Sequence, residues 1–92
     1  MPQRTDEEIV SGYVRDSRLR ILPKKLSRKL LVLRWIADRF ALGTRYSEKE
    51  VNEMLTALHP DYAMLRRALV DHRFMSREAG VYWKEPPEDS GA

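Results

Sequence analysis

The sequence predicts a single small α+β domain that is mostly helical, and three observations lead to this fold class. The 92 residues, 42% of them hydrophobic, are enough for one core and too few for two. Residues 46–73 carry the signals of two helices joined by a sharp turn. Short β-prone runs flank this helix pair, so strands are expected to complete a domain that spans residues 13–84.

The N-terminal region has two parts. Residues 1–12 form either a short helix or an arm, because Thr5-Asp6-Glu7-Glu8 puts carboxylates where a first helical turn favours them. Residues 13–22 form a strand or hairpin, since the turn-forming pair Asp16-Ser17 is followed by alternating basic and apolar residues. That alternation predicts that Leu19 and Ile21 point into the core.

The longest helix is predicted from Lys24 to Phe40, after Pro23 ends the extended run. Its apolar stripe is broad and consists of Leu26, Leu30, Leu31, Leu33, Trp35, Ile36, Ala37 and Phe40. Four cations gather at its N-terminal end, where the helix dipole disfavours them: Lys24, Lys25, Arg28 and Lys29. These side chains are either solvated or placed to contact a phosphate.

A helix pair follows. Gly43 suits the end of the long helix, and residues 44–46 give a short extended link. Ser47 and Glu50 have the spacing of a capping box, so the next helix is expected to begin at Ser47. Its apolar stripe consists of Val51, Met54, Leu55 and Leu58. The run His59-Pro60-Asp61 then ends this helix near Leu58, because proline disfavours the helical conformation of the residue before it.

The second helix of the pair spans about residues 61–73. Its inward side is expected to hold Tyr62, Leu65, Ala68, Leu69 and His72. The remaining positions lie towards or on the other side: Ala63, Met64, Arg66, Arg67, Val70 and Asp71. Residues 74–77 and 81–84 form a hairpin across Glu78-Ala79-Gly80, and residues 85–92 are expected to be a disordered acidic tail.

This order of elements is that of a winged helix-turn-helix, in which the hairpin is the wing and residues 44–46 supply the third strand. The N-terminal strand or hairpin is an addition to it. The predicted core comprises Leu30, Leu33, Ile36, Phe40, Val51, Leu55, Leu58, Leu65, Leu69, Phe74 and Trp83.

The positive charge is unevenly distributed. The formal net charge is +3, yet residues 15–34 alone hold eight basic residues and one acidic residue. Such a block favours a polyanion, most simply duplex DNA, although a solvated basic surface is the alternative. In a winged helix the second helix of the pair enters the major groove, so Arg67 is expected to reach a base edge, with Ala63, Met64, Arg66 and Val70 around it. Phosphates are expected at Lys24, Lys25, Arg28, Lys29 and Arg77.

Several runs resemble a bacterial family catalogued as domain of unknown function 2087, over roughly residues 13–84. They are PKKLSRKLLVLRWIADRF, YSEKEVNEMLTALHPDYAMLRRALVDHRFMSRE and the closing YWK. The resemblance implies a winged-helix-like fold and a transcription-related role, because members occur alone or joined to a separate helix-turn-helix regulator. It implies no particular activity for any residue.

The residue types and motifs of this sequence give little support for catalysis. Cysteine is absent, there are two histidines, and neither a Gly-rich phosphate loop nor an HExxH pattern occurs, so the protein is expected not to be an enzyme and to need no cofactor. One weak metal site is possible in principle from His59, Asp61 and His72, although His59 is more typical of a turn or cap residue. The tripeptide His59-Pro60-Asp61 also resembles that of J-domain co-chaperones, but the helix before it is basic in that family and carries three glutamates here.

Three functions from different classes therefore stay open. The leading one is a DNA-binding transcriptional regulator, the alternative is a protein-association or homodimerisation module without direct DNA contact, and the third, a small enzyme, has the least support. The association module predicts an exposed apolar patch from Trp35, Met64, Val70 and Tyr82. No apolar run reaches the length of a membrane span and the N-terminus lacks a signal-peptide core, so a cytoplasmic protein without membrane contact is expected.

Overall fold

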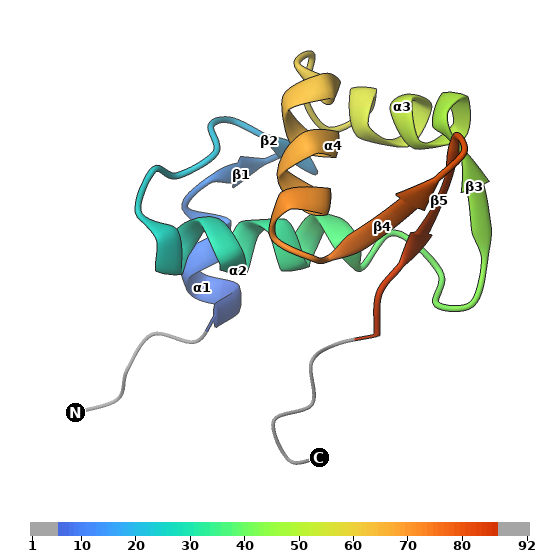
Figure 1. The fold of residues 1–92 in the computed structure, drawn as a ribbon. Coiled ribbons are helices and arrows are strands. Elements are labelled where there is room, and N and C mark those ends of the chain that lie inside the picture. Colours follow the sequence, from blue (N-terminus) through green and yellow to red (C-terminus); the bar gives the residue numbers. More distant parts are fainter. Residues whose placement is uncertain (1–5, 87–92) are drawn as a thin grey trace.

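Residues 6–86 are described in the computed structural model, which arranges them as four helices and two small antiparallel sheets (Figure 1). The elements in chain order are α1 Asp6–Ser11, β1 Val14–Arg15, β2 Arg18–Leu19, α2 Leu26–Ala37, β3 Arg45–Ser47, α3 Glu48–Thr56, α4 Tyr62–Asp71, β4 Met75–Glu78 and β5 Val81–Lys84. None of the helices described in residues 6–86 combines the length and hydrophobicity needed to cross a bilayer.

The N-terminal additions are a short helix and a two-stranded hairpin. Asp16 and Ser17 both adopt positive φ (53° and 65°), as a two-residue turn between right-twisted strands requires. Leu19 is buried as predicted, and its N–H donates to the Leu58 carbonyl (2.9 Å), which joins the hairpin to the end of α3. Ile21 was expected to point inward and is 59% exposed, because β2 ends at Leu19 and the alternation does not continue.

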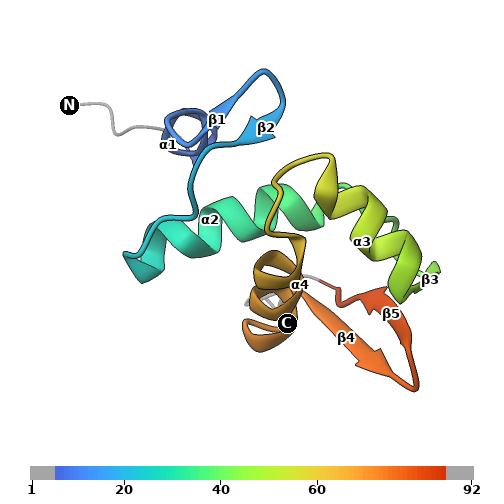
Figure 2. The same cartoon turned by 90° about the horizontal axis from the view of Figure 1, so that it is seen from above.

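The long helix α2 begins later and ends earlier than predicted. Lys25 is its extended N-cap residue, so Lys24 and Lys25 precede the helix. The buried side chains of α2 all lie from Val32 onward, whereas Leu26 is 56% exposed and Leu30 is half-buried, against the prediction. The reason is spatial: the first turns of α2 project beyond α4 in both Figure 1 and Figure 2, so they have no helix to pack against on that side.

Strand β3 runs directly into α3 through Ser47. The predicted capping box is confirmed: the Glu50 N–H donates to Ser47 Oγ (3.1 Å) and the Ser47 N–H donates to Glu50 Oε1 (2.9 Å). The tripeptide 59–61 makes the turn into α4, since the Asp61 N–H donates to His59 Nδ1 (2.9 Å). Asp61 is the N-cap of α4 and accepts from the Met64 N–H (3.2 Å).

The second sheet has the strand order β3-β5-β4, with both pairs antiparallel and β5 in the centre. Ala79 and Gly80 connect β4 to β5, both at positive φ (52° and 79°). Strand β4 also continues the chain from α4, and these two elements contact each other. The sheet edge formed by β4 therefore lies beside α4.

The core is formed entirely by apolar side chains and one tyrosine. Its members are Val10, Leu19, Val32, Leu33, Ile36, Ala37, Phe40, Val51, Leu55, Leu58, Leu65, Leu69, Met75 and Tyr82. The predicted core residues Phe74 and Trp83 are only half-buried, and their neighbours Met75 and Tyr82 take the buried places. Neighbouring residues of a strand point to opposite faces of the sheet. The prediction placed the buried position of each hairpin strand one residue away from where it lies.

Much of the predicted N-terminal arm and most of the predicted acidic tail cannot be compared with the structure. Residues 1–5 and 87–92 lie outside the described residues. Glu85, the first residue of the predicted tail, still belongs to the domain: its N–H donates to the Phe74 carbonyl (3.0 Å) and its Oε2 accepts from Trp83 Nε1 (2.9 Å).

Candidate nucleic-acid interface

Helix α4 presents an arginine-lined cavity where it meets the β4–β5 hairpin. Leu65 and Leu69 fix the helix on the core, and between them Arg67 is exposed while Arg66 and Ala68 are half-buried. The cavity has a volume of about 220 Å³. Its lining residues are Arg66, Arg67, Val70, Asp71, Arg77 and Tyr82. Three of the predicted DNA-contacting arginines are thus brought together, with one aspartate among them.

Arg66 is held by the helix before it. The side chain is half-buried, and its Nη1 donates a hydrogen bond to Asn52 Oδ1 of α3. This bond spans the two helices of the pair. Arg66 is therefore preorganised and has part of its hydrogen-bonding capacity already used.

Arg77 enters the cavity from β4. The pKa of its guanidinium is raised, first by hydrogen bonding to the Tyr82 side chain and further by the negative charges of Glu48 and Asp71. The Tyr82 hydroxyl in turn donates to Glu48 Oε1 (3.1 Å) at the start of α3. Tyr82 thereby links the hairpin to α3 beneath the arginines.

Arg67 differs from both. It is exposed, and within residues 6–86 its side chain forms no hydrogen bond or ion pair. Its neighbour in the cavity is Asp71, one helical turn further on α4. Of the three arginines, Arg67 is the one with all its donors available to a ligand.

The apolar residues predicted around Arg67 are less accessible. Ala63, Met64 and Val70 are half-buried, and Met64 and Val70 pack against the core. Only Val70 lines the cavity. The predicted exposed patch of Trp35, Met64, Val70 and Tyr82 is not present, because Tyr82 is 1% exposed and the other three are half-buried.

The predicted basic cluster at the start of α2 forms a second positive region. Lys24, Lys25 and Arg28 are exposed and Lys29 is half-buried. The α2 N-terminus has neither a side-chain cap nor an acidic residue in its first turn, so its free N–H groups add to the positive potential. Arg28 is partly engaged, since its Nη1 donates to the Tyr13 hydroxyl (3.2 Å).

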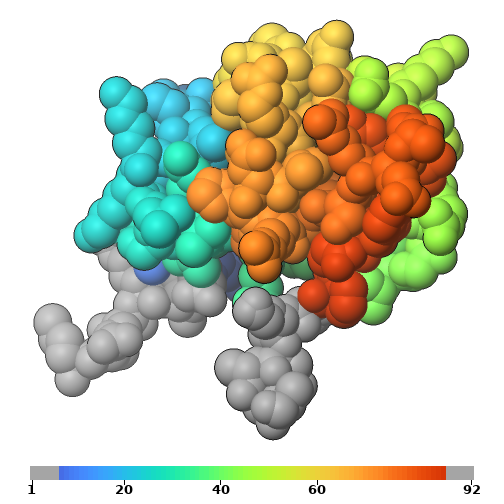
Figure 3. Space-filling view, viewed as in Figure 1, coloured from blue at the N-terminus to red at the C-terminus, as the bar shows by residue number. Residues whose placement is uncertain are grey.

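The elements that carry these two regions share one face. Helix α4 contacts both α2 and β4, and Figure 3 shows the start of α2, α4 and the β4–β5 hairpin side by side. The basic block 15–34 is nevertheless divided. Figure 2 shows the β1–β2 hairpin, with Arg15 and Arg18, across α2 from α4.

The residues proposed for other chemistry are not assembled. Neither His59 nor His72 lines the arginine cavity or the cavity beside α1. Within residues 6–86 no group of three or more histidine, aspartate or glutamate side chains is placed to hold a metal ion. The large apolar side chains exposed in this part of the chain are Ile21, Leu26, Leu42 and Tyr62.

Sequence reasoning missed the residues that position the arginines. Asn52 is 14 residues from Arg66, and Glu48 is 34 residues from Tyr82, so no local pattern connects them. The alternation in Val81–Lys84 could have indicated that Tyr82 and Trp83 face opposite sides, but not which of them faces the core.

Comparison with known proteins identifies a family. No curated protein and no solved structure matches the chain. A family model described as "Uncharacterized protein conserved in bacteria (DUF2087)" matches residues 18–84, which begins at β2 and ends with β5. The chain therefore belongs to the DUF2087 family of bacterial proteins.

Proposed function

We propose that this protein is a small DNA-binding regulator of transcription with a winged helix-turn-helix. The order α2, β3, α3, α4, β4, β5 and the strand order β3-β5-β4 support this architecture. In it, α4 is the recognition helix and the β4–β5 hairpin is the wing. Helix α1 and the β1–β2 hairpin are additions at the N-terminus.

One observation carries the proposal: Arg66, Arg67 and Arg77 line a single cavity between α4 and the hairpin. Guanidinium groups are suited to both phosphate oxygens and guanine edges, because their planar fork donates two parallel hydrogen bonds. The uncapped, basic start of α2 lies on the same face and extends the positive surface beyond α4 (Figure 3). A duplex needs such a continuous track of cations along its backbone.

The arginines divide into two roles in this proposal. Arg66 is held by Asn52, and Arg77 lies in the same cavity as Tyr82, which contributes to its raised pKa, so both offer positive charge to phosphates. Arg67 has free donors on the exposed side of α4 and reads a base edge. Lys24 and Lys25 contact phosphates in any sequence.

The first experiment measures binding without assuming a site. Fluorescence anisotropy with a random-sequence duplex is recorded over a series of salt concentrations, and a preferred sequence is then selected from a random pool. We expect log K to fall linearly with log salt, with a slope of about −0.9 for each phosphate neutralised.

Two substitutions then separate specific from non-specific contacts. Arg67→Ala should lower affinity for the selected site by about 1–3 kcal/mol and change random-sequence binding much less. Lys25→Ala should weaken both alike and reduce the salt slope by about one phosphate contact.

Arg15→Ala is the matched control. Like Lys25→Ala, it removes one positive charge from the basic block 15–34. Arg15 however lies in the β1–β2 hairpin, across α2 from α4 (Figure 2). Its affinity for either duplex should stay close to that of the unmodified protein. If the unmodified protein binds no duplex at low salt, or if Arg15→Ala weakens binding as much as Arg67→Ala, the proposed interface is wrong. A protein-association module using the exposed Ile21 and Leu26 then becomes the better account.

A further inference from the structure

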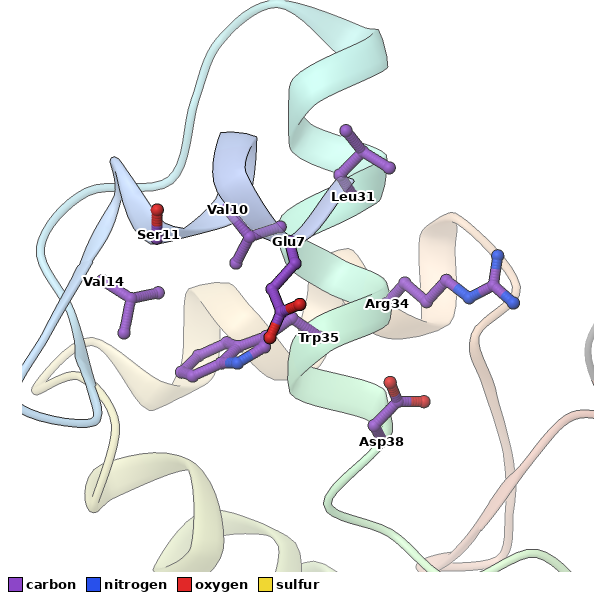
Figure 4. Close-up of a pocket in the computed structure, with 8 residues that line it drawn as sticks. All are labelled: Glu7, Val10, Ser11, Val14, Leu31, Arg34, Trp35 and Asp38. Carbon is purple, nitrogen blue, oxygen red and sulfur yellow. The ribbon is translucent and has the colours of Figure 1, made fainter. Parts of the chain in front are cut away.

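A second cavity lies between α1, β1 and the C-terminal half of α2 (Figure 4). Its volume is about 500 Å³, which falls within the usual range for small-molecule sites, roughly 300–1,000 Å³. The lining residues are Glu7, Val10, Ser11, Val14, Leu31, Arg34, Trp35 and Asp38. The four residues from Glu7 to Val14 precede the segment that the family model matches, so one wall of this cavity is formed by the N-terminal addition.

The centre of the cavity is apolar. Val10, Val14, Leu31 and Trp35 line it, and Figure 4 shows Val10 and Val14 on the same side of α2 as the indole, with Leu31 further towards the start of the helix. Such a lining takes a branched or aromatic hydrocarbon group, which would bury apolar surface from both molecules.

The indole itself is held in place by Arg39. The Arg39 guanidinium lies 3.7 Å from the ring centroid, and its Nη1 donates to the Trp35 carbonyl (3.0 Å). Arg39 is not among the residues that line the cavity. A ligand would therefore meet a rigid aromatic wall.

The charges around the cavity are mixed, because Arg34 lines it beside Glu7 and Asp38 and the Arg39 guanidinium lies on the indole, so the position of each charged group decides which ligand fits. In Figure 4 the Glu7 carboxylate lies on the same side of α2 as the indole, whereas the Arg34 guanidinium extends from the other side of the helix. Asp38 adds a second carboxylate at the C-terminal end of α2, where the helix dipole is negative. Asp38 is shared with Lys84 (3.5 Å), which leaves Glu7 as the main anionic group for a ligand.

We propose that this cavity binds a small organic cation, a protonated amine carried on an aromatic or branched apolar body. The apolar body packs among Val10, Val14, Leu31 and Trp35, and the ammonium group pairs with the Glu7 carboxylate near the indole. The site is independent of the proposed DNA interface, since α4 lies across α2 from α1 (Figure 2).

The test uses three probes with a similar body and different charge: 2-phenylethylammonium, neutral 2-phenylethanol and anionic 3-phenylpropanoate. Titration calorimetry is performed on the full chain. Fluorescence is recorded in a Trp83→Phe variant, in which Trp35 is the remaining tryptophan. We expect the cation to bind about two- to fivefold more tightly than either other probe, the ratio that one exposed ion pair supplies.

Glu7→Gln should remove that preference and leave binding of 2-phenylethanol unchanged. Leu31→Ala should weaken all three probes alike, because it acts on the apolar body. Glu53→Gln, which neutralises an exposed glutamate of α3, is the control and should change nothing. Equal affinity for the three probes, tighter binding of the anion, or no saturable binding of the cation in the millimolar range would each overturn the proposal, whatever the outcome with DNA.

Discussion

Two adjacent arginines on α4 have different surroundings, and this difference decides their proposed roles. Residues 66 and 67 are separated by about 100° around a helix, so one can face α3 while the next faces outward. Arg66 bonds to Asn52 of α3, and Arg67 is exposed without a bonding partner in the described residues. The sequence analysis expects Arg67 to reach a base edge, and of the two arginines Arg67 is the one that retains all its donors for a ligand.

A second residue-scale feature is the end of α4, which closes as a Schellman motif. The Phe74 N–H donates to the Leu69 carbonyl (2.8 Å) and the Arg73 N–H donates to the Val70 carbonyl (3.1 Å). Arg73 occupies the position that glycine usually takes, at φ 64°. An L-residue is strained there, by roughly 1–2 kcal/mol.

Arg73→Gly is therefore expected to stabilise the protein by about 0.5–1 kcal/mol in urea unfolding, since glycine adopts this conformation freely. Arg73→Ala is its control, because it removes the same charge and keeps the positive φ. It should give no gain. Equal stabilisation by both variants would show that the arginine charge, not the backbone conformation, is responsible.

At the scale of elements, the junction between β3 and α3 depends on a single residue. Ser47 pairs with Val81 in the sheet and also caps α3, so it fixes where the strand ends and the helix begins. Two hydrogen bonds join Ser47 and Glu50, each from the backbone N–H of one residue to the side chain of the other. They satisfy N–H groups that the start of the helix would otherwise leave free.

Ser47→Ala should lower the free energy of unfolding by about 1 kcal/mol through loss of this cap. Ser27→Ala is the comparison, because Ser27 is exposed in the first turn of α2, a helix without a side-chain cap. We expect its effect to stay within about 0.5 kcal/mol. Thermal and urea unfolding measure both. A Ser47→Ala variant as stable as the unmodified protein would mean that the cap contributes nothing at this junction.

At the scale of the whole molecule, one core joins helices that are distant in the sequence. Leu65 is fully buried on α4, and it belongs to the same cluster as Leu33 of α2, Leu55 of α3 and Tyr82 of β5. The close packing of this core holds α4 in place, and with it the arginines on the outer side of the helix.

Leu65→Ala should destabilise the protein by roughly 2–5 kcal/mol, because it leaves a cavity in this core. Leu26→Ala makes the same change at a position that periodicity also assigns to the core but that is 56% exposed. It should cost less than about 0.5 kcal/mol. Similar losses for the two variants in urea unfolding would contradict the burial described for Leu26.

The sequence by itself determined the local features of this protein. The capping box at Ser47 and Glu50, the turn at residues 59–61, the buried pair Leu65 and Leu69, and the hairpin after α4 all follow from signals a few residues apart. The match to the DUF2087 family covers residues 18–84, which include all of these features.

Only the tertiary structure decided which of two equivalent patterns is buried and which distant groups meet. Met75 and Tyr82 are buried in place of Phe74 and Trp83, because strand alternation fixes a spacing and the packing of the sheet chooses the face. Leu26 is exposed because α2 extends past α4, a length relation that helical periodicity does not contain. The contacts of Arg66 with Asn52 and of Tyr82 with Glu48 also depend on how the elements pack, and not on any local pattern in the sequence. They join helices and strands that only the shared core brings together.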